Sequence, residues 1–154
     1  MRNINLKTVV EVATEIVKEK GSDYIYPGSF YDDCKYWDYD EQEPSCLVGH
    51  VFYNTALISS EAEFLLIENS TFDQACVALE RWQRAEFTES AQHFLYVLQN
   101  RQDAGWTWGR SLEFARAATE AIENGDVENV HVAINYQIEH EDKEGSPDLW
   151  GWES

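Results

Sequence analysis

Basic residues are scarce in this chain. Its 154 residues contain 11 Lys and Arg against 29 Asp and Glu, which gives a formal net charge of −18. Nucleic-acid phosphates and anionic membrane surfaces both bind through clustered Lys and Arg, so direct binding to either is disfavoured. The same excess of acid attracts a basic partner and speeds its association, especially at low salt. The alternative interpretation is that the charge only keeps the protein soluble.

Cysteine and long apolar runs are also in short supply. Three cysteines are too few for a disulfide framework and leave ligand, core and redox roles open. No stretch approaches the roughly 18 apolar residues of a membrane span. Glu11 and Glu15 interrupt what would have to be the apolar core of a secretory signal. We therefore expect a cytoplasmic protein.

The chain is nevertheless hydrophobic enough to fold. Hydrophobic residues make up 44% of it and aromatic residues 14%, which excludes a disordered chain despite the charge. Its length fits one domain with a single core, and we find no internal repeat. We predict a globular domain over residues 1–140 and an acidic tail over residues 141–154 that carries Trp150 and Trp152.

Apolar residues recur at helical spacing along most of the chain. Ser60 with Glu63, and Thr71 with Gln74, match the capping-box pattern that starts a helix. Cys76 falls on an apolar helix face and is expected to be buried. The last two helices should form a hairpin in which Trp106 and Trp108 pack into the core. Together the patterns predict six helices, over residues 5–20, 46–56, 60–67, 71–82, 88–102 and 108–124.

After Gly125 the apolar period changes from 3.6 to 2. Valine, isoleucine and tyrosine alternate with other residues over residues 129–139, which predicts a half-buried strand. A single strand must pair, so we expect it to join residues 24–26 or 34–37 in a small sheet, or to form a homodimer with a second copy. The predicted fold class is α+β, predominantly α-helical, with five or six helices and a small antiparallel or mixed sheet.

The stretch over residues 34–57, CKYWDYDEQEPSCLVGHVFYNTAL, holds the residues best suited to chemistry. If Ser45 caps a helix, Cys46 and His50 stand one turn apart on one face, and Cys34 could return across a turn as a third ligand. Sulfur with imidazole favours zinc, although the paired Cys-x2-Cys knuckle is missing. The fourth ligand would be Cys76, His93, His131 or an acid among residues 32–43.

Other interpretations of the same residues stay open. Cys34 and Cys46 could pack beside the helix while His50 makes an ordinary hydrogen bond. The two cysteines could form a reversible disulfide, or Cys46 could be a reactive thiol at the start of a helix. A Cys46–His50 nucleophile pair oriented by Asp103 fits less well, because no glycine-rich oxyanion loop is evident. Gly49 would let another backbone approach closely.

Acidic and aromatic residues are mixed at residues 31–40 and 148–152. The acids miss the calcium-loop pattern, which needs a Gly at its sixth position and a Glu at its twelfth. Tyr and Trp provide rigid contact area, and flanking carboxylates complement a basic partner. We therefore predict a partner-binding surface formed by Asp32, Asp33, Trp37, Asp38, Asp40, Glu41, Glu43, Glu139, Glu141, Asp142, Glu144, Trp150 and Trp152.

The heptapeptide PSCLVGH at residues 44–50 is a fairly specific motif. It is accompanied upstream by Tyr24, Pro27 and residues 34–36, CKY, and downstream by residues 102–105, QDAG, and 107–109, TWG. In this pattern the chain resembles small proteins encoded by actinobacteria and their bacteriophages. The resemblance implies a phage or actinobacterial origin and no activity. If a phage encodes the protein, its location is the cytoplasm of the host cell.

Two functions compete on these grounds. The first is a non-enzymatic, phage-type interaction protein whose acidic face binds and blocks a basic host protein, in imitation of the phosphates of DNA. It needs no cofactor. The second is a small metal- or thiol-dependent enzyme, or a zinc-stabilised module, centred on Cys34, Cys46 and His50.

Overall fold

A computed structural model describes residues 1–28 and 35–143. Within them the chain forms seven helices and four short strands, so the protein is predominantly α-helical with a small amount of sheet, as predicted. In chain order the elements are β1 (Arg2–Ile4), α1 (Leu6–Lys20), β2 (Trp37–Asp38), β3 (Glu43–Pro44), α2 (Leu47–Asn54), α3 (Glu61–Leu65), α4 (Phe72–Arg81), β4 (Ala85–Phe87), α5 (Glu89–Asp103), α6 (Trp108–Glu123) and α7 (Val130–Lys143).

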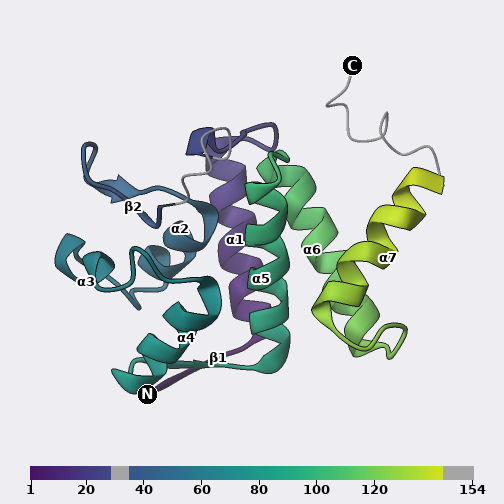
Figure 1. Ribbon diagram of the computed structural model, residues 1–154. Helices are drawn as coiled ribbons and strands as arrows, with labels where there is room; N and C mark the ends of the chain where they lie inside the picture. The colour runs from purple at the N-terminus through teal and green to yellow at the C-terminus, as the bar shows by residue number, and fades with distance from the viewer. Residues whose placement is uncertain (29–34, 144–154) are drawn as a thin grey trace.

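The three long helices α1, α5 and α6 lie side by side at the centre of the molecule (Figure 1). α2 packs on α1 and α5, whereas α7 packs on α6 and α5. None of the helices within residues 1–28 and 35–143 is both long enough and apolar enough to cross a membrane. The core between the central helices is filled by Val9, Ala13, Ile16, Phe94, Leu95, Leu98, Trp108, Phe114 and Ala115.

Side chains cap the starts of the helices, and at α4 the capping box is the one that the sequence predicted. At α4 the side chain of Thr71 accepts a hydrogen bond from the main-chain amide of Gln74, and the side chain of Gln74 accepts one from the amide of Thr71. This reciprocal pair satisfies two amides that the helix itself leaves without partners. Threonine side chains cap two further helices in the same way, Thr88 at α5 and Thr107 at α6.

The small sheets are built mostly from segments other than those predicted, although β2 begins at Trp37, the last residue of the strand predicted over residues 34–37. β1 and β4 pair in parallel, with Arg2 opposite Ala85 and Ile4 opposite Phe87. β2 and β3 pair in an antiparallel hairpin. Residues 24–26, predicted to be a strand, are irregular.

Residues 130–139 belong to α7 and Asn129 lies just before it, so the strand predicted over residues 129–139 is wrong. α7 buries Ala133 and Ile134, and Ile138 packs half-buried against the core. These positions are spaced by about one helical turn, which puts them on one face of a helix. Apolar residues also lie on the exposed face of α7, and the resulting alternation in the sequence led to the prediction of a strand.

Asn129 provides the signal that the alternation concealed. Its side chain accepts a 3.0 Å hydrogen bond from the main-chain amide of Val132, as an N-cap residue does. Because a helix has no open strand edge, the predicted homodimer through strand pairing of residues 129–139 loses its physical basis. α7 also continues to Lys143, past the predicted boundary between domain and tail.

Candidate functional site

The helix that carries the PSCLVGH motif begins after Cys46. Cys46, rather than the predicted Ser45, is the N-cap of α2: its buried thiol accepts a 3.4 Å hydrogen bond from the main-chain amide of Gly49. Ser45 instead contacts the hydroxyl of Tyr26 at 3.0 Å and donates its amide to the carbonyl of Tyr36. The motif is therefore tied to the preceding loop by both side-chain and main-chain bonds.

His50 lies one turn into α2 and is mostly buried. Its Nδ1 is 2.9 Å from the main-chain oxygen of Cys46, and its ring meets Trp108 edge-on at 5.4 Å between centroids. Burial lowers the pKa of His50 below its usual value, which favours the neutral ring. Since Nδ1 must carry the proton to donate to a carbonyl, Nε2 keeps the lone pair. These contacts are the ones expected if Cys46 and His50 serve packing.

The structure describes only some of the residues that the zinc hypothesis needs. Within the part of the chain that the structure describes, no group of three or more His, Cys, Asp or Glu residues is placed to hold a metal ion. Cys34 lies outside the described residues, so the metal and disulfide hypotheses stay predictions. Of the candidate fourth ligands, Cys76 is buried on α4 as predicted, His93 lies 3.8 Å from Glu89, and His131 lies on α7.

Gly49 is a point of close backbone approach, as predicted. A Cβ atom at this position would lie 2.1 Å from the main-chain oxygen of Tyr36, a distance that no side chain can occupy. Gly109, in the TWG motif, has the same property, because its Cβ would lie 2.7 Å from the main-chain oxygen of Ser22. Both motif glycines therefore exist to let a loop cross a helix.

The downstream motifs meet the heptapeptide at one junction. The main-chain amide of Leu47 donates a 2.8 Å hydrogen bond to Oε1 of the buried Gln102, and the amide of Trp108 donates one of 2.8 Å to the oxygen of Tyr24. Tyr24 also meets the ring of Trp108 edge-on at 4.6 Å. The residues that carry the resemblance thus perform structural tasks, joining α2, α5 and α6.

The β2–β3 hairpin brings four of the predicted partner-binding acids together: Asp38, Asp40, Glu41 and Glu43. Its turn is stabilised by the Asp38 side chain, which accepts hydrogen bonds from the amides of Asp40 and Glu41 at 3.0 and 3.1 Å. Gln42 completes the turn in the left-handed conformation, with φ of 57°. The tight turn holds the exposed carboxylates of Asp40, Glu41 and Glu43 close together.

Two further carboxylates, on α3 and just beyond it, bind the hairpin. The side-chain Nε2 of Gln42 donates a 3.1 Å hydrogen bond to the carboxylate of Glu61. Glu68 accepts bonds from the hydroxyl of Tyr39 at 2.7 Å and from the amide of Tyr36 at 2.9 Å. We call the hairpin together with Glu61 and Glu68 the acidic hairpin face.

Burial and charge on this face act on two tyrosines. Burial, followed by the hydrogen bond and charge of Glu68 and the charge of Glu61, raises the pKa of Tyr39 far above its usual range. Burial and the charge of Glu43 raise the pKa of Tyr24. Both phenols therefore stay protonated, and Tyr39 remains a donor to Glu68.

A cavity of about 390 Å³ lies beside the hairpin. Its aromatic lining includes Tyr24 and Tyr39, its acidic lining includes Asp40 and Glu43, and Lys20 borders it with Nζ 5.4 Å from the ring centre of Tyr24. Aromatic walls and charges of both signs make it suitable for a polar side chain of a partner.

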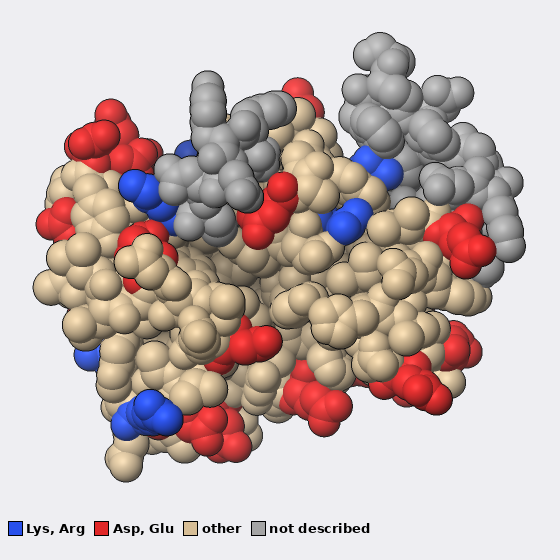
Figure 2. Space-filling view, viewed as in Figure 1, with Lys and Arg blue, Asp and Glu red and all other residues tan. Residues whose placement is uncertain are grey.

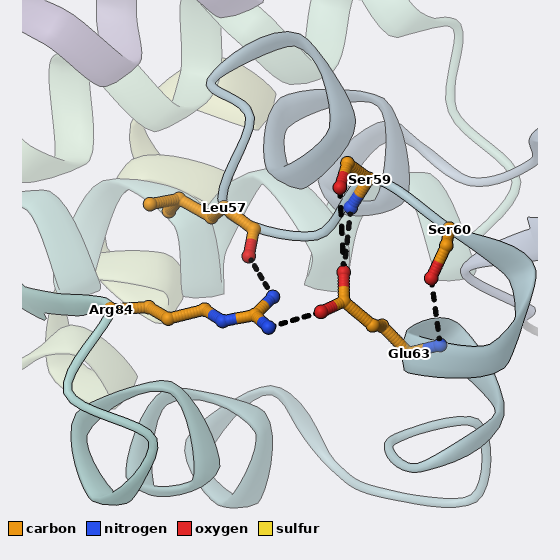
Figure 3. Close-up of polar contacts among 5 residues, drawn as sticks. All are labelled: Leu57, Ser59, Ser60, Glu63 and Arg84. Atoms are coloured by element: carbon orange, nitrogen blue, oxygen red, sulfur yellow. Dashed lines mark hydrogen bonds and ion pairs between the residues drawn. The ribbon is translucent and has the colours of Figure 1, made fainter.

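A clamp holds α3 in place below the hairpin (Figure 3). The guanidinium of Arg84 contacts the carboxylate of Glu63 and donates a 3.0 Å bond to the oxygen of Leu57. The second carboxylate oxygen of Glu63 accepts a 3.1 Å bond from the amide of Ser59. The predicted capping box is therefore half formed: Ser60 accepts the amide of Glu63, but the Glu63 carboxylate turns to Ser59 and Arg84.

Two exposed leucines lie at the end of α3, and sequence reasoning did not identify them as functional. Phe64 on α3 and Ile67 in the turn after it are buried, whereas Leu65, the last residue of α3, is 60% exposed and Leu66, its C-cap, is 69% exposed. The signal was available, because an inward pair three residues apart forces the two residues between them outward.

The other predicted partner-binding residues are not exposed on the acidic hairpin face or fall outside the described residues. Trp37 is 5% exposed and stacks on Phe64 at 4.9 Å, so it supports the hairpin from inside and does not offer the contact surface predicted for it. Glu139 is exposed on α7, on the opposite side of the molecule from β2 (Figure 1). The predicted residues outside the described part are Asp32, Asp33, Glu144, Trp150 and Trp152, with the side chains of Glu141 and Asp142.

Comparison of this chain with known protein families, with characterised proteins and with solved structures gives no match.

Proposed function

We propose that this protein is a non-enzymatic interaction protein that binds a basic partner through the acidic hairpin face. The observation that carries the proposal is the gathering of Asp38, Asp40, Glu41 and Glu43 on one tight hairpin that contains no Lys or Arg. Glu61 and Glu68 extend the same face. A cluster of like charges that a fold holds together complements a positively charged surface and accelerates its approach.

The surface around the hairpin supports this reading. In Figure 2, Asp and Glu side chains gather where the end of the hairpin lies in Figure 1, and again along the lower edge of the same face. None of the salt bridges found within residues 1–28 and 35–143 involves an acid of the hairpin. Its charge is therefore available to a partner.

The partner that fits best is a basic host protein, in keeping with the resemblance to phage and actinobacterial proteins. Carboxylates displayed on a rigid surface could imitate DNA phosphates and so inhibit a DNA-binding protein. If so, duplex DNA and this protein compete for the same partner, and the competition weakens as salt is raised.

The test is capture of basic proteins from a host extract, followed by titration of the purified partner at graded salt. We expect the triple variant Asp40→Asn, Glu41→Gln, Glu43→Gln to bind at least about tenfold more weakly than the unaltered protein. Asp38 is left intact because it holds the turn.

A matched control changes three exposed acids of α6, with Glu113→Gln, Glu120→Gln and Glu123→Gln. It reduces the net negative charge by the same amount but leaves the hairpin intact. Equal losses in both triple variants, or an affinity that does not change with salt, would show that the hairpin is not a binding site.

The alternative function, a zinc-stabilised module or a small metal- or thiol-dependent enzyme, draws on one contact. A histidine that binds metal usually donates its second ring nitrogen to a carbonyl or carboxylate, and His50 donates Nδ1 to the oxygen of Cys46. Elemental analysis of protein purified under reducing conditions decides the zinc reading. About one zinc per chain, lost in Cys46→Ser, supports it, and absence of zinc removes it.

A further inference from the structure

Leu65 and Leu66 form an apolar patch that the fold itself does not require. α3 anchors to the core through Phe64 and Ile67, both fully buried, while the two leucines between them are 60% and 69% exposed. In Figure 2 the surface where α3 lies, below the acidic end of the hairpin, is largely free of charged side chains. We call Leu65 and Leu66 the leucine patch.

Carboxylates flank this patch. Glu61 precedes Leu65 by one helical turn and so lies on the same face of α3. Glu68 follows Leu65 by three residues. Both carboxylates also reach the hairpin, Glu61 through Gln42 and Glu68 through Tyr39. The leucine patch therefore lies directly against the acidic hairpin face.

The platform beneath the leucines is held at several points. Phe64 stacks on Trp37 at 4.9 Å between ring centres, with the ring planes 20° apart. Arg84 contacts the carboxylate of Glu63 and donates a hydrogen bond to the main-chain oxygen of Leu57, which ties α3 to the loop before it. A patch held in one conformation loses little entropy when a partner binds to it.

We infer that the leucine patch receives apolar side chains of a basic amphipathic helix in the partner, whose Lys and Arg residues contact the surrounding carboxylates. The inference rests on the proposed function and names the class of partner segment. An apolar centre with a charged rim is the usual anatomy of a protein interface. An amphipathic helix with basic flanks offers the complementary arrangement, because its apolar stripe is bordered by Lys and Arg.

The probes are two short peptides of the same Leu and Lys composition. One places its leucines at helical spacing, and the other disperses them. We expect the patterned peptide to bind about tenfold more tightly than the dispersed one, and the variant Leu65→Gln, Leu66→Gln to abolish that preference. Val77→Gln, at an exposed apolar position on α4, is the control and should leave the preference unchanged.

Titration with peptide, followed through methyl resonances of the leucines, gives a second readout that does not depend on a variant. Equal binding of both peptides, or an unchanged preference in the double leucine variant, overturns the inference about the leucine patch. If peptide binding still weakens with salt in that case, the proposed function stands. If the hairpin triple variant binds both peptides as well as the unaltered protein does, the proposed function fails as well.

Discussion

The main-chain amide of Leu47 donates its hydrogen bond to the side chain of Gln102, 55 residues away in the sequence. The amide belongs to the first turn of α2, where the helix provides no acceptor of its own. Gln102 is fully buried near the end of α5, and its Nε2 in turn donates to Asp103 at 3.0 Å. One side chain thus joins the PSCLVGH motif to the QDAG motif.

Replacing Gln102 should therefore destabilise the protein. Gln102→Met keeps the volume but leaves the buried amide of Leu47 without an acceptor, at a cost of about 2 kcal/mol in the free energy of unfolding. Urea denaturation measures it. The same change at the half-buried Gln137 of α7 is the control and should cost much less. Equal losses would mean that the bond to Leu47 contributes nothing.

Cys46 separates the packing and metal hypotheses. As an N-cap it needs only an acceptor for the amide of Gly49, which a serine hydroxyl provides. We expect Cys46→Ser to change stability by less than about 1 kcal/mol and Cys46→Ala to lose about 1 kcal/mol with the cap. Thermal melts of metal-free and zinc-supplemented protein provide the check. Collapse of the fold in Cys46→Ser would favour a ligand role instead.

The Glu63–Arg84 pair should make stability sensitive to acid. The hydrogen bond from Arg84, followed by that from the amide of Ser59, lowers the pKa of Glu63 from its usual 4.5 to about 2. Because the pKa of Glu63 is lower in the folded protein than in the unfolded chain, its charge stabilises the fold at pH values above the unfolded-state pKa. This stabilisation is lost as the pH falls from 4.5 through about 2. Both side chains are partly exposed, so we expect only about 1 kcal/mol.

The corresponding experiment is urea unfolding of Glu63→Gln at neutral pH and at pH values below 4.5. The difference from the unaltered protein should shrink in acid, because both then lack the charge. Glu11→Gln removes the exposed Lys7–Glu11 pair and serves as control, with no measurable change expected. A difference that persists undiminished in acid would argue against the ion pair.

Gly49 should tolerate no side chain. In Gly49→Ala the new methyl meets the main-chain oxygen of Tyr36, which cannot turn aside as a side chain would, so we expect a loss of about 3 kcal/mol or more. Gly105→Ala offers the comparison: nothing lies within 4 Å, but φ is +88°, and the strain costs about 1 kcal/mol. Urea midpoints of the two variants should differ accordingly. Similar midpoints would place the Tyr36 loop further from α2.

Part of the candidate site could be grouped from the sequence alone. Asp38, Asp40, Glu41 and Glu43 fall on one hairpin because a two-residue strand pair and a tight turn are local structures. Local patterns gave no information about Glu61 and Glu68, which join this face through contacts between distant segments. Trp37 was predicted on the surface for the same reason, since only the packing of Phe64 against it decides its burial.

The positions of α1 to α6 followed from the sequence alone, because apolar spacing and N-cap residues such as Thr71, Thr88 and Thr107 act within a few residues. The state of residues 129–139 was decided by tertiary structure. Their alternating pattern suits a strand, but a strand needs a partner, and the strands within residues 1–28 and 35–143 pair among themselves. A helix satisfies its own backbone and buries Ala133 and Ile134. Burial against a neighbouring helix outweighed the local preference.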